Sequence, residues 1–362
     1  LLPCRRRTQA LEDELLHPLA FVGFGRIQVA LRVDRHAVRR VELTRLTAAE
    51  PDPADVAAVA RALRAVGGGL AAGLGDEGVD LGLEVRRALT GRAGSVVDSL
   101  RATVRNARAA RQMLSARTWR LLAMLDTEAT ALARLAGDPG LDLPEAGFAT
   151  FDATEAIDRV LVPLGALAGL TNESVVRGPG WRFLDIGRRI ERSLLVLGLV
   201  EALFDPPAGS GQHAGGPDTV GSDGVGSPRG LLAPSPVRGD VALAACESLV
   251  AYRRRHRSDI TLDALGDLLL ADRDNPRSVR FQLDQLVVDR HDLPDRSVRR
   301  TQIAAVRTAQ RAIDAHLPLG SGAGRGGLSP VGRLVIAVRE PILAVGDLVP
   351  RGWFSERPRR VR

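Results

Sequence analysis

The chain has 362 residues, of which 45% are hydrophobic and 26% are charged, so a disordered or fibrous protein is excluded and a globular one is expected. Arginine supplies every basic side chain other than histidine, because the sequence contains no lysine. Chemistry that needs a Schiff-base lysine, a phosphate-loop lysine or a lysine general base is therefore excluded for this chain.

The formal net charge of +7 is concentrated in residues 351–362, which form a basic tail. Aromatic residues make up only 3% of the chain and offer little stacking surface for bases, so nucleic-acid binding, for which the tail is the one candidate, is not expected. No apolar run reaches the roughly 18 residues that a membrane span needs. Cys4 and Cys246 are isolated and the histidines form no ligand motif, so we expect a cytoplasmic protein without a metal or cofactor.

In chain order, residues 1–45 give mixed signals and are assigned as a poorly defined N-terminal segment. From Asp52, a candidate cap, apolar residues recur with helical spacing. A second cap is expected at Ser115, and Pro163 is expected to kink its helix. The helices predicted in this first half, 46–204, cover about 52–66, 81–89, 93–114, 116–132, 152–167 and 181–203.

Residues 205–238 are rich in Gly, Pro and Ser, so they are predicted to be a flexible linker. Helical spacing resumes in the second half, 239–350, with caps predicted at Asp240, Thr261 and Asn275. The predicted helices run from Asp240 through Tyr252, and over about 262–270, 276–286, 298–317 and 330–348. The fold class is therefore all-α, a multi-helix bundle of one domain with a long Gly/Pro-rich disordered insertion.

Arginines recur on one side of the predicted helix 93–114. Arg101, Arg105, Arg108 and Arg111 form either a solvated face or a partly buried ladder that grips carboxylates or an anionic ligand. Spacing alone leaves both interpretations open.

A second cluster of charge lies within the predicted helix 181–203, where Asp185 has the spacing to pair with Arg188 and Arg189. Further along the chain, Tyr252 to His256 place three arginines beside the only tyrosine, and residues 275–282 add amide and hydroxyl groups. Together these groups predict either one polar groove between helices or a structural polar network.

At these residues the sequence resembles the Alpha-E family, a helical domain with a conserved Glu-Arg motif. The resemblance is carried by GPGWRFLDIGRRIERSL (178–194), by the segment 246–286 with its DNPRS motif, and by RNARAARQMLSARTWRLL (105–122). It spans roughly residues 50–357. Carried over residue by residue, it implies functional roles for Glu191 and Arg192, for Tyr252, Arg253 and Arg255, and for Asn275, Pro276, Arg277 and Ser278.

The family pattern also includes an N-terminal helix with a second Glu-Arg, and this sequence departs from it. Arg35 and His36 are the nearest counterparts, but Val38 stands where glutamate is expected, and the sequence does not begin with methionine. These departures motivate the hypothesis of a truncated or frame-shifted N-terminus.

The resemblance implies partnership with circularly permuted ATP-grasp ligases and with transglutaminase-like proteins in peptide ligation or tagging. On this hypothesis the chain is an accessory domain that binds its partner or a carboxylate-bearing peptide through Arg188, Arg192, Arg253 and Arg277. The alternative is a stand-alone enzyme that uses Glu191 as acid or base beside an arginine clamp on an acyl or peptide substrate. The adjacent arginines favour the charged carboxylate over the protonated acid, which makes the accessory role the preferred hypothesis.

Overall fold

The structure is a computed structural model that describes residues 52–66, 80–90, 95–109, 111, 114–135, 150–205, 235–256, 259–290, 296–319 and 328–349. Within these ranges the chain forms 12 α-helices and one π-helical segment and contains no strand, which confirms the all-α fold class. The predicted segments 1–45 and 351–362, and residues 206–234 of the predicted linker, lie outside the described residues.

The first half begins its helices close to the predicted positions. Asp52 accepts a hydrogen bond from the backbone N–H of Ala54 (2.9 Å), and Ser115 accepts one from Thr118 (3.2 Å), so both predicted caps are confirmed. The helices are α3 (Pro53–Val66), α4 (Leu81–Leu89), α5 (Val96–Ala109), α6 (Ala116–Leu135), α7 (Thr150–Ser174) and α8 (Pro179–Phe204). Pro163 lies inside α7, which starts two residues before the predicted position.

The second half contains shorter helices followed by a long helical hairpin. Thr261 caps α11 as predicted, by accepting a hydrogen bond from the N–H of Ala264 (3.3 Å). The elements are α9 (Pro236–Ala245), α10 (Leu249–Arg255), α11 (Leu262–Gly266), the π-helical η4 (Asp267–Ala271), α12 (Val279–Arg290), α13 (Arg296–His316) and α14 (Pro330–Val349).

The predicted cap at Asp240 and the continuous helix through Tyr252 are both wrong. Ser235 caps α9 by accepting a hydrogen bond from the N–H of Val237 (3.2 Å), so Pro236 occupies the first turn and Asp240 lies inside the helix. The helix stops at Ala245 because Glu247 adopts a left-handed conformation (φ 50°). The N–H of Ser248 then bonds back to the carbonyl of Leu243 (2.7 Å), the pattern of a Schellman turn.

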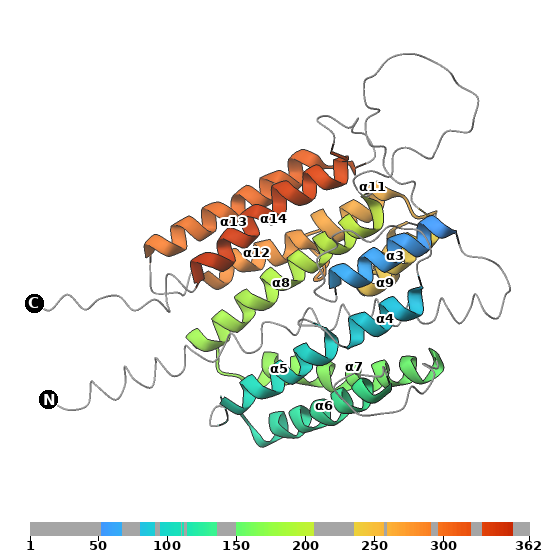
Figure 1. Ribbon diagram of the computed structural model, residues 1–362. Coiled ribbons are helices and arrows are strands. Elements are labelled where there is room, and N and C mark those ends of the chain that lie inside the picture. Colours follow the sequence, from blue (N-terminus) through green and yellow to red (C-terminus); the bar gives the residue numbers. More distant parts are fainter. Residues whose placement is uncertain are drawn as a thin grey trace, which may run out of the picture.

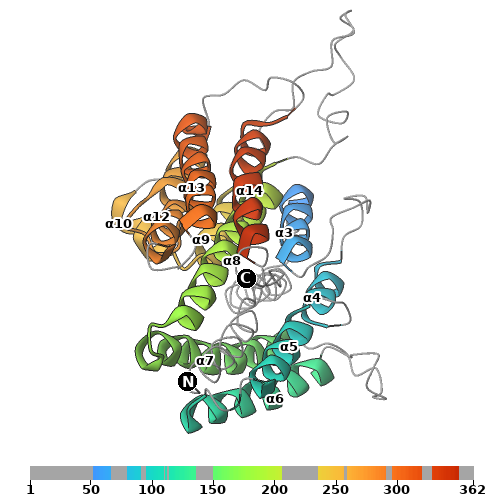
Figure 2. The ribbon, with the colours of Figure 1, turned by 90° about the vertical axis from the view of Figure 1, so that its left-hand side faces the viewer.

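Helix α8 runs through the middle of the molecule and contacts α3, α9, α12 and α14 (Figure 1). Its C-terminal half is mostly apolar, with Leu197, Leu199, Val200 and Leu203 fully buried, as expected for a helix surrounded by others. Glu201 in this half pairs with Arg339 of α14. Helices α5, α6 and α7 pack together below it, and α13 and α14 lie side by side on the opposite side (Figures 1 and 2). This arrangement leaves the polar N-terminal half of α8 facing α12.

A buried ion pair joins the two halves of the domain. Asp55 of α3 accepts hydrogen bonds from Arg238 of α9 (2.7 Å) and from the hydroxyl of Ser235 (2.6 Å). Because these partners are separated by about 180 positions in the sequence, the interaction fixes where the chain re-enters the bundle after residues 206–234.

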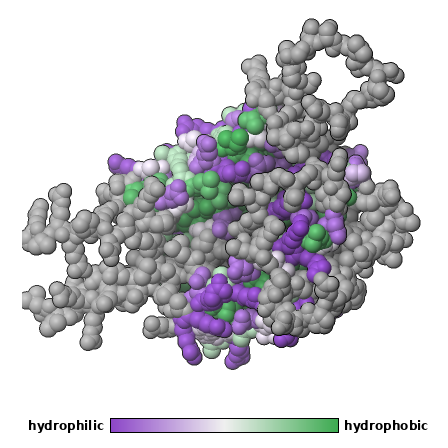
Figure 3. Space-filling model, in the orientation of Figure 1, coloured by the Kyte–Doolittle hydropathy of each residue, from purple (hydrophilic) through white to green (hydrophobic). Residues whose placement is uncertain are grey.

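Hydrophilic and hydrophobic residues are mixed over the visible described surface (Figure 3). Among the described helices, none is both long and apolar enough to cross a membrane.

Candidate functional site

The polar half of α8 is organised by one buried carboxylate. Asp185 is fully buried and pairs with Arg188, one turn further along the helix, and with Arg189 (Nε to Oδ2, 2.8 Å). Arg188 also donates to the side-chain oxygen of Asn172 at the end of α7 (3.0 Å). The predicted pairing is therefore confirmed, but it is a buried network rather than a surface ion pair.

Arg189 extends this network to α12. Its guanidinium donates to the side-chain oxygen of Gln282 (3.1 Å) and lies 5.8 Å from the centre of the Phe281 ring. Gln282 is fully buried and donates in turn to the carbonyl of Pro276 (2.6 Å). The Asp185 network thus holds α8 against the turn that precedes α12.

That turn contains the predicted Asn-Pro-Arg-Ser motif, and two of its side chains are structural. Asn275 is buried; its amide donates to the Ser248 hydroxyl (3.1 Å) and to the carbonyl of Leu268 (2.9 Å), while its oxygen accepts from the N–H of Arg277 (3.0 Å). Ser278 is the residue that caps α12, since its hydroxyl accepts from the N–H of Phe281 (3.0 Å). The prediction of Asn275 as the cap is wrong by three residues, because the side chain of Asn275 closes the preceding turn.

Arg277 projects from this turn and remains partly exposed. It forms an ion pair with Glu247, the residue that breaks the chain between α9 and α10 in a left-handed conformation. A non-glycine residue in that conformation is uncommon and carries a conformational cost, so the turn positions the Glu247 carboxylate at the expense of local strain.

The predicted motif of Tyr252, Arg253 and Arg255 lies beside the same turn. Its tyrosine is buried and structural, whereas its arginines lie nearer the surface. Tyr252 is buried, and its hydroxyl accepts from the N–H of Thr261 (3.1 Å) and donates to the carbonyl of Asp259 (3.3 Å), so it fastens α10 to the start of α11. Arg255 pairs with Asp272 immediately before the Asn-Pro-Arg-Ser turn, and Arg253 is exposed.

Arg192 carries a largely buried charge that Asp185 offsets only in part. Its Nε atom is buried without a hydrogen-bond partner, and no described residue forms an ion pair with its guanidinium. Burial, followed by repulsion from Arg277, Arg188 and Arg189, lowers the pKa of Arg192 to about 9, while Asp185 acts in the opposite direction. Four arginines therefore converge around one position.

Glu191, the neighbour of Arg192 in the Glu-Arg dipeptide, is partly buried, with its Oε2 atom shielded from solvent. The structure thus brings Arg188, Arg192 and Arg277 together and places Tyr252, Asn275 and Ser278 in supporting positions. Glu247 was not singled out from the sequence, although it lies in the family-like segment 246–286, and Asn172 gave no sequence signal.

The arginines of α5 do not contribute to this site. Arg105 and Arg108 are exposed, and Arg108 pairs with Asp126 of α6 (3.1 Å) on the surface. Arg111, just after the helix, is also exposed and lies 5.9 Å from the centre of the Trp119 ring. For these three arginines the geometry corresponds to the solvated face, one of the two interpretations that spacing left open, whereas Arg101 is half-buried.

Within the described ranges, no group of three His, Cys, Asp or Glu side chains has an arrangement that can hold a metal ion. The chemistry that the site offers is recognition of an anion by guanidinium groups, which bind planar oxyanions through paired hydrogen bonds.

Uncharacterized proteins of Mycobacterium bovis and of two strains of Mycobacterium tuberculosis are each 32% identical to the chain over 206 residues. The match covers 57% of this chain but 20% of each relative, so the chain spans about a fifth of the length of these curated relatives. No solved structure matches the chain.

Residues 28–320 match the family described as "a predicted alpha-helical domain with a conserved ER motif". Within those residues the sequence contains one Glu-Arg dipeptide, Glu191–Arg192, the pair at the centre of the arginine cluster. The match covers most of the chain, and the chain therefore belongs to the Alpha-E family.

Proposed function

We propose that the chain is a helical accessory domain of an ATP-grasp-type amide or peptide ligase system, and that it binds a carboxylate-bearing peptide at Arg192 and Arg277. The observation that carries the proposal is the buried charge of Arg192, which lies among three further arginines and is offset only in part by Asp185. A bound carboxylate offsets both the burial of this cation and its repulsion from its neighbours.

The other contacts of the cluster explain why Arg192 and Arg277 are the ligand-binding groups. Arg188 and Arg189 are committed to Asp185 and, through Arg189, to Gln282. Arg277 is more accessible, and its partner Glu247 is 42% exposed, so this ion pair can open toward an incoming anion at small cost. The buried Asp185 network then serves as the rigid support on which the two arginines are held.

An accessory role, rather than ligation by this chain alone, is favoured by its chemistry. The chain has no lysine with which to hold nucleotide phosphates, and the site that it does assemble recognises anions. The resemblance to companions of circularly permuted ATP-grasp ligases supplies the class of partner that handles ATP. A transglutaminase-like protein is a second partner that the same resemblance supports.

Affinity capture from the native host tests this role. The tagged wild-type chain is compared with Arg192→Gln, which keeps the size and polarity of the side chain but removes its charge, and with Arg120→Gln, an exposed arginine of α6, as the matched control. We expect mass spectrometry to identify an ATP-grasp protein with the wild type and the control and to find it depleted with Arg192→Gln. We also expect the purified chain to hydrolyse no ATP by itself. If a folded wild type captures no such ligase, or hydrolyses ATP alone, the accessory role is refuted.

A further inference from the structure

The hairpin of α13 and α14 forms one side of the molecule (Figures 1 and 2). Each helix carries a row of exposed side chains, basic on α13 and acidic on α14. On α13 the outward residues at intervals of four, three and four are Arg300, Ala304, Arg307 and Arg311. On α14 the same intervals give Ile336, Glu340, Leu343 and Asp347, all of them exposed. Residues with this spacing lie on one face of a helix, so each helix presents a continuous stripe.

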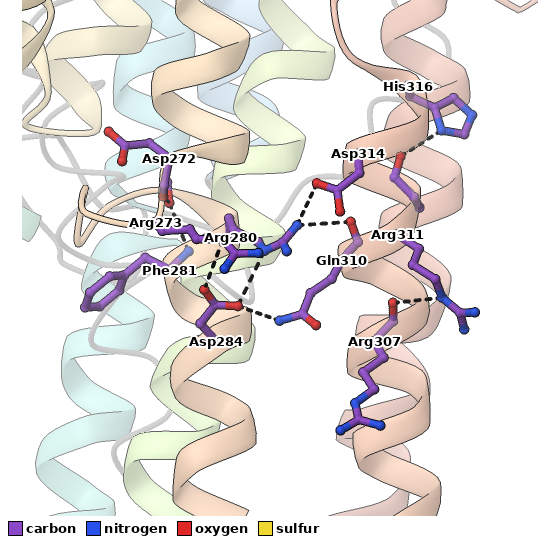
Figure 4. Close-up of polar contacts among 12 residues, drawn as sticks. Asp272, Arg273, Arg280, Phe281, Asp284, Arg307, Gln310, Arg311, Asp314 and His316 are labelled. Atoms are coloured by element: carbon purple, nitrogen blue, oxygen red, sulfur yellow. Dashed lines mark hydrogen bonds and ion pairs between the residues drawn. The ribbon is translucent and has the colours of Figure 1, made fainter.

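The stripe on α13 borders a hollow of about 680 Å³ between α12 and α13. Asp314, the carboxylate that lines this hollow, accepts a hydrogen bond from Arg280 (2.7 Å). Arg280 also lies 3.4 Å from Asp284, which accepts from Gln310 (2.6 Å). Figure 4 shows this network, with the guanidinium groups of Arg307 and Arg311 directed away from it.

Arg300, Arg307 and Arg311 consequently form no ion pair with any described residue. The three guanidinium groups are spread over eleven positions of one helix, or about 16 Å, which suits an extended partner rather than a small anion.

The stripe on α14 has the complementary composition. Ile336 and Leu343 are 40% and 48% exposed, which is high for side chains of this kind. Glu340 and Asp347 are exposed beside them and form no ion pair within the described chain. This surface thus offers an apolar contact and two negative charges.

We propose that this surface is an interface between two copies of the chain, in which α13 of each copy packs against α14 of the other. The two helices have 21 and 20 residues and lie side by side as an antiparallel hairpin. A two-fold axis parallel to them therefore places α13 opposite α14 of the second copy at the same height. Arg300 then faces Asp347 of the second copy, Arg307 faces Glu340, and Ala304 receives Leu343. The symmetry repeats each contact, so the assembly closes as a dimer.

Charge complementarity selects a second copy over other occupants. The acidic residues of α14 repel a nucleic-acid backbone or an anionic membrane, whereas the same residues match the arginines of an identical chain. Rows of matched charge around an apolar contact are also how paired helices select their partners and orientation. Because the charges are exposed, the dimer is expected to weaken as salt rises.

Sedimentation equilibrium on the whole chain tests the interface. We expect the wild type to form dimers in the micromolar range, and Arg307→Glu and Glu340→Arg each to raise the dissociation constant at least about tenfold. Each single variant then dimerises more weakly than the wild type, but an equimolar mixture of the two regains the wild-type affinity, because every reversed charge faces its opposite across the mixed pair. The double variant is restored for the same reason. Arg120→Glu on α6 is the control for net charge, and circular dichroism checks that each variant is folded.

A wild type that remains monomeric across that range overturns the proposal. A dimer that persists in both single variants, or a mixture that behaves like its separate components, overturns it equally. None of these variants touches Arg192 or Arg277, so the outcome is independent of the ligase proposal.

Discussion

Replacing Arg192 with methionine is expected to stabilise the folded chain. The lowering of its pKa to about 9 corresponds to roughly 5 kcal/mol that the fold expends to keep this arginine charged at neutral pH. Methionine retains much of the side-chain volume without the charge, and replacing a buried charged group by an apolar one of similar size typically adds about 1–4 kcal/mol. We expect a gain in that range.

The pH dependence of this gain follows from the direction of the shift. Below pH 9 both the folded and the unfolded chain hold the Arg192 proton, so the folded state carries the full free-energy cost of the buried charge. Above pH 9 the folded chain releases the proton while the unfolded chain keeps it, so wild-type stability rises relative to that of Arg192→Met. The advantage of the variant is therefore constant at neutral pH and declines as the pH increases beyond 9.

Urea denaturation at several pH values between 7 and 10 measures both effects, with Arg120→Met as an exposed control that leaves stability within about 0.5 kcal/mol. An Arg192→Met chain that is less stable than wild type at pH 7 contradicts the reasoning, because it means that the guanidinium is already satisfied within the fold.

Three further substitutions test the support of the site. Asp185→Asn removes the charge that Arg188 and Arg189 share, so we expect a loss of about 3–5 kcal/mol in urea denaturation, and a loss below 1 kcal/mol contradicts a buried network. Ser278→Ala removes the cap of α12 and is expected to cost about 1 kcal/mol, measured in the same way; an unchanged midpoint argues against capping. Tyr252→Phe breaks the contact between α10 and α11 and is expected to cost about 1 kcal/mol while leaving peptide affinity unchanged in calorimetry; a loss of affinity instead assigns the hydroxyl to the ligand.

The helices could largely be predicted from the sequence because apolar periodicity and caps are local signals. The range 81–89 is reproduced as α4, and the caps at Asp52, Ser115 and Thr261 are correct. The errors occur where a non-local contact decides the boundary. Continuity from α9 to α10 was predicted from spacing, whereas the chain turns at Glu247, whose carboxylate meets Arg277 from a distant segment.

The sequence identified the residue types of the candidate site, but it did not show which of these residues stabilise the fold and which lie in the arginine cluster. Sequence motifs grouped Asn275, Arg277 and Ser278 as equals, yet two of them fold the turn and only Arg277 reaches the cluster. Convergence of Arg192 and Arg277 depends on α8 packing against α12, which periodicity within either helix does not encode. The sequence also did not predict that the stripes on α13 and α14 lie on adjacent helices, because their proximity depends on the packing of the hairpin.

Titration calorimetry of the purified chain with a short peptide tests the central claim most directly. The probe is an acetylated dipeptide ending in glutamic acid with free carboxylates, and its comparison ligand is the same dipeptide with both carboxylates converted to amides. We expect the wild type and Arg120→Gln to bind the free acid, and both the amide ligand and Arg192→Gln to lower the affinity by at least about tenfold. Equal affinity for the acid and the amide, or binding that survives in Arg192→Gln, contradicts the assignment of Arg192 as the anion-binding centre.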